Sequence, residues 1–415
     1  MTAVAPDGRS ASDSRKRPPD GWRWVRLGEA IQEAQLGFAC GERDPNGTVQ
    51  LRMNNVTGRG GFDWSTTTRV PADSETIQMY RLQLGDVLFN NTNSTDLVGK
   101  TAIFEGFDEP VVFSNHFTRL RTLDDLLSPR FLALWLRKQW QSRLFANICN
   151  RWIGQSAVQR DKLLALEIPL PPLLEQQRIA AILNEQMEAV GRARAAADAR
   201  LEAAKALLAA YLDATFDSQE IRRWPSESLG NVLQLRKEIV HPRDNPQGPA
   251  TFVGLEHIES ITGRRTGSID LEKAALTGRK PQFYTGDIVY GYLRPYLNKV
   301  WMAEFDGLCS VDQYVYSVGP DKANTEFVAW FMRSPGYLKS APIDTTPGQL
   351  PRIRIEEVSS VEIHLPPIAE QERIVRTLKA QVDAAERVRR AVGEELAAIN
   401  ALPAALLRRA FNGEL

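Results

Sequence analysis

The sequence predicts an α+β protein: two mixed α/β globular domains separated by two long antiparallel coiled-coil helices, with a pseudo-two-fold internal repeat. The segment at residues 170–179 returns at 365–374, which is an offset of 195 residues. Each copy opens a long segment rich in Ala, Leu, Glu and Arg. The rest of each half is rich in Gly, Thr, Asn and aromatic residues, with short apolar runs between turn signals.

Further matches lie in the same order in both halves, so the repeat covers most of the chain. They are Gly85-Asp86 with Gly286-Asp287, Gly154-Gln155 with Gly348-Gln349, residues 131–136 with 327–332, and Phe216 with Phe411. The repeat predicts five parts: a flexible tail (1–21), a first globular domain (22–169), a helix (170–221), a second globular domain (222–364) and a helix (365–415).

Each globular domain should carry one clear helix near its end. Ser128 and Pro129 supply an N-cap and a proline at the first helical position for a helix over 131–148. Thr325 is expected to cap a second helix over 327–338. The short apolar runs elsewhere in both domains predict strands.

The long segments 173–216 and 368–411 predict helices because they begin after Pro-Pro and contain few β-formers. Their apolar residues recur in steps of three, four and seven, which is typical of a coiled-coil seam. Helices of this kind would be about 60 Å long. Pro403 has no equivalent in the first segment, so we expect the second helix to kink or end early near it.

The composition indicates a globular protein and limits the function classes. Lys+Arg and Asp+Glu both number 51, which excludes DNA binding through bulk positive charge but allows local basic patches. Cys40, Cys149 and Cys309 are widely separated and offer no disulfide or metal motif, as in a reducing cytoplasm. No apolar run is long enough to cross a bilayer, so we expect a cytoplasmic protein.

Catalytic motifs are missing from the sequence. It contains no GxxxxGK[ST] loop, no complete GxGxxG fingerprint and no HExxH pair, and its four histidines are scattered singly. The adjacent acidic pairs Asp124-Asp125 and Glu356-Glu357 suit solvated faces better than a metal site. This indicates a binding or scaffolding role, with no catalytic, cofactor or metal site in the chain.

Polar loops in both domains carry residue types that recognise DNA. Arg can bond bidentately to guanine, Asn and Gln to adenine, and Lys can hold phosphates. The candidate DNA contacts are Arg52, Asn55, Arg59, Asn91, Asn93, Lys100 and Gln155 in the first domain, and Arg264, Arg265, Arg279, Tyr292, Arg294, Tyr296, Lys299 and Gln349 in the second. Structural roles compete with these: Asn93 could close a turn, Tyr296 could be core, and Gln155 and Gln349 could pin their loops.

The repeated motif carries a family resemblance. Leu-Pro-Pro-Leu-Leu-Glu-Gln-Gln at 170–177 and Leu-Pro-Pro-Ile-Ala-Glu-Gln-Glu at 365–372, each after a globular domain, resemble the specificity subunit of type I restriction-modification systems. Residues 84–94 and 293–300 are similar to stretches of that family's target recognition domains, although Asn91 stands where many members have Arg.

The resemblance implies a non-catalytic subunit in which each target recognition domain binds one half of an asymmetric bipartite site in double-stranded DNA. The helices would set the spacing and dock two methyltransferase subunits, with restriction subunits in the full complex. S-adenosylmethionine, ATP and Mg would then belong to the partner subunits. The helix-start residues Glu175, Gln176, Arg178, Glu370, Gln371 and Arg373 are the docking candidates.

Two alternatives stay open at this stage. The first is a coiled-coil interaction scaffold without DNA specificity. The second is an enzyme whose active site the sequence does not reveal.

Overall fold

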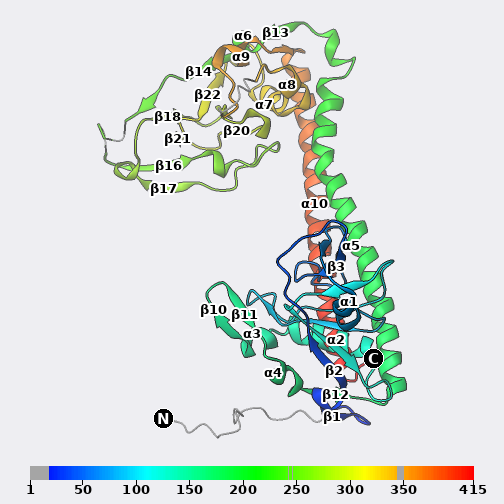
Figure 1. Ribbon diagram of the computed structural model, residues 1–415. Helices are drawn as coiled ribbons and strands as arrows, with labels where there is room; N and C mark the ends of the chain where they lie inside the picture. Colours follow the sequence, from blue (N-terminus) through cyan, green and yellow to red (C-terminus); the bar gives the residue numbers. More distant parts are fainter. Residues whose placement is uncertain (1–17, 242, 245, 344–349) are drawn as a thin grey trace. The chain divides into compact units, whose positions relative to one another are not determined.

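The computed structural model describes residues 18–415 except 242, 245 and 344–349, and it divides by packing into two units (Figure 1). Unit 1 consists of Met1–Ala195 and Ala397–Leu415, and unit 2 of Ala196–Leu396. Both division points lie inside the long helices α5 (Leu173–Phe216) and α10 (Ile368–Phe411). Each unit therefore contains one globular part, the start of one long helix and the end of the other.

Unit 1 is a mixed α/β structure with four sheets. The central sheet has the order β2-β9-β5-β7, a second sheet β4-β3-β8, a third β10-β11-β6, and β1 pairs with β12. The strands are β1 (Arg23–Arg26), β2 (Ile31–Leu36), β3 (Thr48–Leu51), β4 (Thr68–Val70), β5 (Val87–Asn90), β6 (Thr92–Asn93), β7 (Thr101–Ile103), β8 (Val111–Phe113), β9 (Phe117–Thr122), β10 (Asn150–Trp152), β11 (Gln155–Ala157) and β12 (Glu167–Leu170). The shorter helices are η1 (Leu27–Glu29), α1 (Ser74–Tyr80), α2 (Pro129–Gln141), α3 (Leu144–Ile148) and α4 (Arg160–Leu164).

Unit 2 repeats the strand orders of three of these sheets, and its described residues contain no counterpart of the sheet β10-β11-β6. Its central sheet is β14-β22-β19-β20, β13 pairs with β23, and β17-β16-β21 continues into β18 and β15. The strands are β13 (Ser226–Ser228), β14 (Leu233–Leu235), β15 (Ile239–Val240), β16 (Pro249–Val253), β17 (Ile269–Glu272), β18 (Lys280–Phe283), β19 (Ile288–Gly291), β20 (Val300–Met302), β21 (Gly307–Cys309), β22 (Gln313–Val318) and β23 (Glu362–His364). The helices are η2 (Ile221–Arg223), α6 (Leu229–Val232), η3 (Leu255–His257), η4 (Lys273–Ala275), η5 (Pro295–Leu297), α7 (Thr325–Arg333), α8 (Pro335–Ser340) and α9 (Ile355–Ser360).

The central strand of each unit separates two hydrophobic clusters. In β5, Val87 and Phe89 pack into the cluster that includes α2, whereas Leu88 packs into the cluster of β3 and β8. In β19, Tyr290 packs on the α7 side and Val289 on the opposite side. Both faces of these strands are covered, which explains why their runs are continuously apolar.

The predicted long helices are confirmed, each with 44 residues. The expectation that the second would end early near Pro403 is wrong, because α10 continues through Pro403 to Phe411. Leu407, Ala410 and Phe411 are buried in the core of unit 1. Packing of this last turn and a half offsets the backbone hydrogen bond that proline removes.

The shorter helices differ from the expectation in two places. The helix over 131–148 is broken into α2 and α3 at Arg143, whose φ is 65°. Ser128 occupies the N-cap of α2, but its side chain forms no capping bond. In unit 2 the expected helix over 327–338 is likewise broken, into α7 and α8 at the extended residue Ser334. The cap of α7 is Asn324, not Thr325, and its side chain accepts a bond from the Phe327 amide at 3.0 Å.

Candidate nucleic-acid interface

The loop after β5 gathers several of the predicted DNA-contact residues of unit 1. Asn91 donates a bond to Thr92 Oγ1 at 3.0 Å and also to the Asn115 carbonyl. Asn93 donates to Asn90 Oδ1 at 2.7 Å and accepts from the Ser94 amide at 2.8 Å. Asn93 thus fills the turn-closing role that competed with DNA contact, while both side chains stay partly accessible.

A β-hairpin joins this loop and presents an apolar tip. Strand β11 pairs with β10 and, through Ser156 and Asn93, with β6. At the tip, Trp152 is 61% exposed and Ile153 fully exposed. Gln155 lies beside them, is exposed and does not pin its loop to a helix. Sequence reasoning missed the tip residues, although two apolar residues before Gly154 in an otherwise polar hairpin are a readable signal.

Arg52 lies near the loop after β5, but its guanidinium group already forms hydrogen bonds within the chain. Its Nη2 donates to the Cys40 carbonyl at 2.7 Å and to Gln50 Oε1 at 3.2 Å. Burial and, to a smaller extent, the Arg52 charge lower the pKa of His116. Arg52, Asn91, Asn93 and Gln155 therefore belong to one region of unit 1, the candidate interface.

Asn55 and Lys100 hold the chain of residues 53–66 in place. Asn55 is buried; it accepts a bond from the Arg52 amide at 2.9 Å and donates to the Asp63 and Thr66 carbonyls. Lys100 Nζ, also buried, donates to the Val56 and Met53 carbonyls, and burial lowers its pKa. The geometry favours structural roles for both side chains.

In unit 2, the arginines of the loop 259–265 form ion pairs. Arg264 lies 3.1 Å from Glu259 and 3.2 Å from Glu386 of α10. Arg265 lies 3.3 Å from Glu304 and stacks over the Phe305 ring. These ion pairs neutralise the two arginine charges of the loop, and the Arg264–Glu386 pair connects the loop to α10.

The segment 292–299 provides the more accessible groups of unit 2. Tyr292 stacks on Tyr314 with ring centroids 4.4 Å apart. Arg294, in a left-handed conformation, directly precedes the short helix η5, and Tyr296, 54% exposed, lies within that helix. Tyr296 is therefore not a core residue.

The remaining predicted residues of unit 2 differ in their surroundings. Arg279 is exposed. Burial raises the pKa of Tyr292, and the Arg279 charge offsets part of that rise. Lys299 donates to the Leu255 carbonyl at 2.6 Å. Gln349 lies outside the described residues.

Each long-helix motif has a glutamine that binds its own globular part. Gln176, fully buried, accepts a bond from the Ser128 amide at 2.8 Å and donates to the Leu126 and Pro171 carbonyls. Gln371 accepts from the Asn324 amide at 2.8 Å and donates to the Pro366 carbonyl. The two glutamines thus satisfy the N-terminal ends of α2 and α7, so the structure gives them an internal role.

The charged residues of the motif lie on the first turns, where the arginines are exposed and the glutamates are partly exposed. Glu175 pairs with Arg178 at 2.7 Å, and Glu370 pairs with Arg373 at 2.6 Å. These ion pairs lower the pKa of both glutamates. Arg178 also donates to the carbonyl of Leu415 in the same unit.

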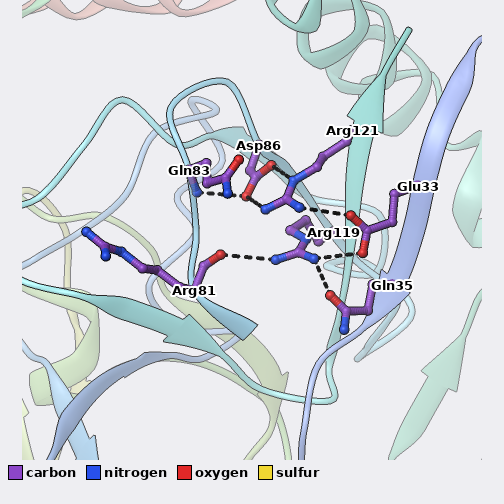
Figure 2. A network of polar contacts seen from close by, with 7 residues as sticks. All are labelled: Glu33, Gln35, Arg81, Gln83, Asp86, Arg119 and Arg121. Carbon is purple, nitrogen blue, oxygen red and sulfur yellow. Dashed lines mark hydrogen bonds and ion pairs between the residues drawn. The ribbon is translucent and has the colours of Figure 1, made fainter. Parts of the chain in front are cut away.

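A buried polar network supports the central sheet of unit 1 (Figure 2). Arg121 bonds Asp86 at 2.7 Å and Glu33 at 2.9 Å, and buried Arg119 bonds Glu33 at 2.8 Å. Asp86 also accepts from the Gln83 amide. In unit 2, Asp287 accepts from the Tyr284 amide and pairs with Arg236 at 3.0 Å. The repeated Gly-Asp dipeptide therefore marks the same turn in both units, with its carboxylate bonded to a backbone amide and an arginine.

Comparison with known proteins shows which proteins this chain resembles. A family model described as type I restriction modification DNA specificity domain matches residues 42–189. The chain is 29% identical to the EcoDI specificity subunit of Escherichia coli, covering 96% of this chain and 90% of the relative. It is 27% identical to a putative MjaX specificity subunit of Methanocaldococcus jannaschii over 75% of each chain.

Two solved structures share the fold. A chain from a study of the assembly and conformational transition of the type I R-M system aligns with a TM-score of 0.75, at 22% identity, over 96% of this chain and all of the other. The HsdS subunit from Thermoanaerobacter tengcongensis aligns with a TM-score of 0.62, at 21% identity, over 97% and 99%. The fold, a mixture of sheets and long helices, is thus one already known for this class.

The family model and the relatives agree, and the chain is similar to the specificity subunits of type I restriction-modification systems. Within the described residues, no helix is long and apolar enough to span a membrane. Those same residues contain no group of three or more His, Cys, Asp or Glu side chains placed to hold a metal ion.

Proposed function

We propose that this chain is the non-catalytic, sequence-specific DNA-binding subunit of a type I restriction-modification complex. The observation that carries the proposal is the specificity-domain match over residues 42–189, which contains the exposed hairpin tip and the asparagine loop. Polar side chains beside an accessible aromatic residue suit contact with base edges and the DNA backbone.

Two target recognition domains, 22–169 and 222–364, would each bind one half of a bipartite site. The repeated strand orders support a pseudo-two-fold pair of readers. Their accessible groups differ, with asparagines and Trp152 in the first and Arg294 and Tyr296 in the second. Different groups recognise different bases, so the two half-sites should differ in sequence.

The long helices, with the motif at the start of each, would set the half-site spacing and dock two methyltransferase subunits in an antiparallel coiled-coil arrangement. A helix of 44 residues is about 66 Å long. In unit 2, Arg200 of α5 lies 2.9 Å from Glu395 of α10, which supports antiparallel packing. Gln176 and Gln371 serve the subunit's own fold, so docking would rest on accessible residues such as Glu175, Arg178, Glu370 and Arg373.

Methylation of adenine and ATP-dependent cleavage would reside in the methyltransferase and restriction subunits. S-adenosylmethionine, ATP and Mg would bind there, and the present chain would bind no cofactor for those reactions. It would act in the cytoplasm, where the host DNA is.

Filter binding of duplex DNA to the complex with methyltransferase subunits, at low and moderate salt, tests the proposal. A DNA reader should show affinity that falls steeply with salt and a preference for one sequence over random duplexes. Absence of both would favour the coiled-coil scaffold, which binds protein only.

A further inference from the structure

Unit 1 contains a cavity of about 820 Å3 between the loop 57–61, helix α2 and the two long helices. All of its lining residues lie within 1–195 and 397–415, and therefore within one unit. Cavities that bind small organic ligands commonly enclose roughly 300–1,000 Å3. The volume suits a small molecule and excludes a DNA duplex.

The cavity wall carries more positive than negative groups. Five arginines line it against three acidic residues. Arg130 lies 2.8 Å from Glu105, and Arg143 lies 2.7 Å from Asp96, so these two cations are compensated. Glu188 has Arg192 at 3.9 Å, and the lining residue Arg194 also makes an interaction of its own. Uncompensated positive charge remains at two other arginines of the wall.

These two arginines are Arg59, on the glycine-rich loop, and Arg137, on α2. Neither has a carboxylate partner among the described residues. Arg137 Nε is buried without a hydrogen-bond partner there, and so is Oε1 of the neighbouring Gln141. Burial, and to a smaller extent the Arg59 charge, lowers the pKa of Arg137 to about 10, which still leaves it cationic at neutral pH. A buried cation beside a second cation destabilises the fold unless an anion compensates it.

The opposite wall combines an apolar strip with polar side chains of the same helices, which are Asn184, Glu188, Arg194 and Asn400. Met187 and Val190 of α5 and Ile399 and Pro403 of α10 line it. Pro403 corresponds by the repeat to Leu208, which is buried in the core of unit 2. The proline that breaks the repeat is therefore part of a cavity wall instead of a core.

We propose that this cavity binds a small organic phosphate of nucleotide size, with the phosphate held between Arg59 and Arg137 and the organic part against the apolar strip. Guanidinium groups bind phosphate oxygens through charge-assisted hydrogen bonds, which supply the missing acceptor for Arg137 Nε. The Gln141 amide lies within the same wall and can turn its N–H toward the anion. The site is separate from DNA recognition, and Arg59 serves the cavity and not the DNA interface.

Calorimetric titration of the full-length chain with AMP, adenosine and inorganic phosphate tests this proposal. AMP should bind more tightly than either fragment, because only AMP engages both walls. Arg137→Gln should weaken AMP binding roughly tenfold or more, since it removes a charged hydrogen-bonding partner. Arg160→Gln, an exposed arginine outside the cavity, is the matched control and should leave AMP binding unchanged.

Thermal unfolding keeps the test independent of folding defects. Without ligand, Arg137→Gln should melt at the same temperature as the unmodified chain or higher, because an uncompensated buried charge is gone. AMP should raise the melting temperature of the unmodified chain and not that of the variant. Absence of AMP binding to the unmodified chain would overturn the proposal, as would a loss of duplex affinity in Arg137→Gln without any AMP effect. Intact sequence-specific DNA binding in either case would leave the proposed function standing.

Discussion

At the residue scale, the glutamine of the repeated motif explains why the same short sequence stands at the start of both long helices. Gln176 and Gln371 each accept a bond from the amide of the N-cap residue of a helix in the adjoining globular part. A glutamine four residues into a helix can satisfy a neighbouring helix end while keeping its own helix intact. The motif thus fixes the joint between globular part and helix.

Replacing Gln176 by Leu should lower the free energy of unfolding by about 1–3 kcal/mol, because the buried Ser128 amide and Leu126 carbonyl lose their partner. Gln371→Leu should have a similar effect in unit 2. Urea denaturation of the full chain measures both. Gln139→Leu, on the partly buried last turns of α2, is the control. A stable Gln176→Leu chain that fails only to bind methyltransferase would show a docking role instead.

Replacing Lys100 distinguishes a DNA-phosphate contact from a structural role within the fold. A lysine bound to a DNA phosphate contributes about one unit to the slope of log affinity against log salt. Because Lys100 is buried against the Val56 and Met53 carbonyls, Lys100→Met should leave that slope unchanged and lower the unfolding midpoint. A salt slope reduced by about one, with an unchanged unfolding midpoint, would instead show that Lys100 contacts a DNA phosphate.

The pH dependence of stability follows from the same burial. The pKa of Lys100 is lowered in the folded chain, so between the folded pKa and the unfolded value of 10.5 the unfolded chain binds more protons. The contribution of Lys100 to stability therefore rises as the pH increases through that window. From pH 8 to 10.5, the unfolding midpoint of the unmodified chain should rise relative to that of Lys100→Met, because groups common to both proteins cancel in the comparison.

At the element scale, composition predicted the long helices well because helix propensity and the Pro-Pro start are both properties of the local sequence. The break at Arg143 could not be predicted, since the apolar pattern continues across it and only the packing of Phe145 against Phe89 and Gly99 requires it. Likewise, the burial of Lys100 depends on carbonyls 44 residues away in the chain. The candidate loops were predictable by residue type, but not which of their side chains stay accessible.

The hairpin β10–β11 should contribute to DNA affinity through its tip. Trp152→Ala combined with Ile153→Ala should weaken binding to the cognate site by about tenfold, because aromatic contact with bases is lost. The unfolding midpoint should not change, since both side chains are exposed. Leu174→Ala, an equally exposed apolar residue, is the control. Unchanged affinity in the hairpin variant would show that the tip does not contact DNA.

Pro403 should cost stability within α10 even though the helix continues through it. Pro403→Ala restores a backbone hydrogen bond and should raise the free energy of unfolding by about 1–3 kcal/mol. Leu402→Ala, at an exposed neighbouring position, provides the comparison in urea denaturation. A lowered midpoint for Pro403→Ala would mean that the proline ring supplies packing that the backbone bond does not replace.

At the scale of the whole molecule, two units that share the strand orders of three sheets and differ in their accessible side chains suit the reading of a split, asymmetric sequence. Exchanging residues 222–364 for the equivalent domain of a related subunit should change one half of the recognised sequence and leave the other. Changes in both halves would contradict modular recognition. The exact balance of 51 basic and 51 acidic residues then reflects ion pairs within the units, as at Arg264, and not an absence of DNA-binding groups.

The central claim is that this chain directs methylation to one bipartite site. Co-expression with its methyltransferase subunit in a host free of other adenine methylation, followed by genome-wide mapping of N6-methyladenine, measures it directly. The account predicts a single split motif with two different half-sites and a fixed gap. No methylated motif, or a continuous palindrome, would contradict it.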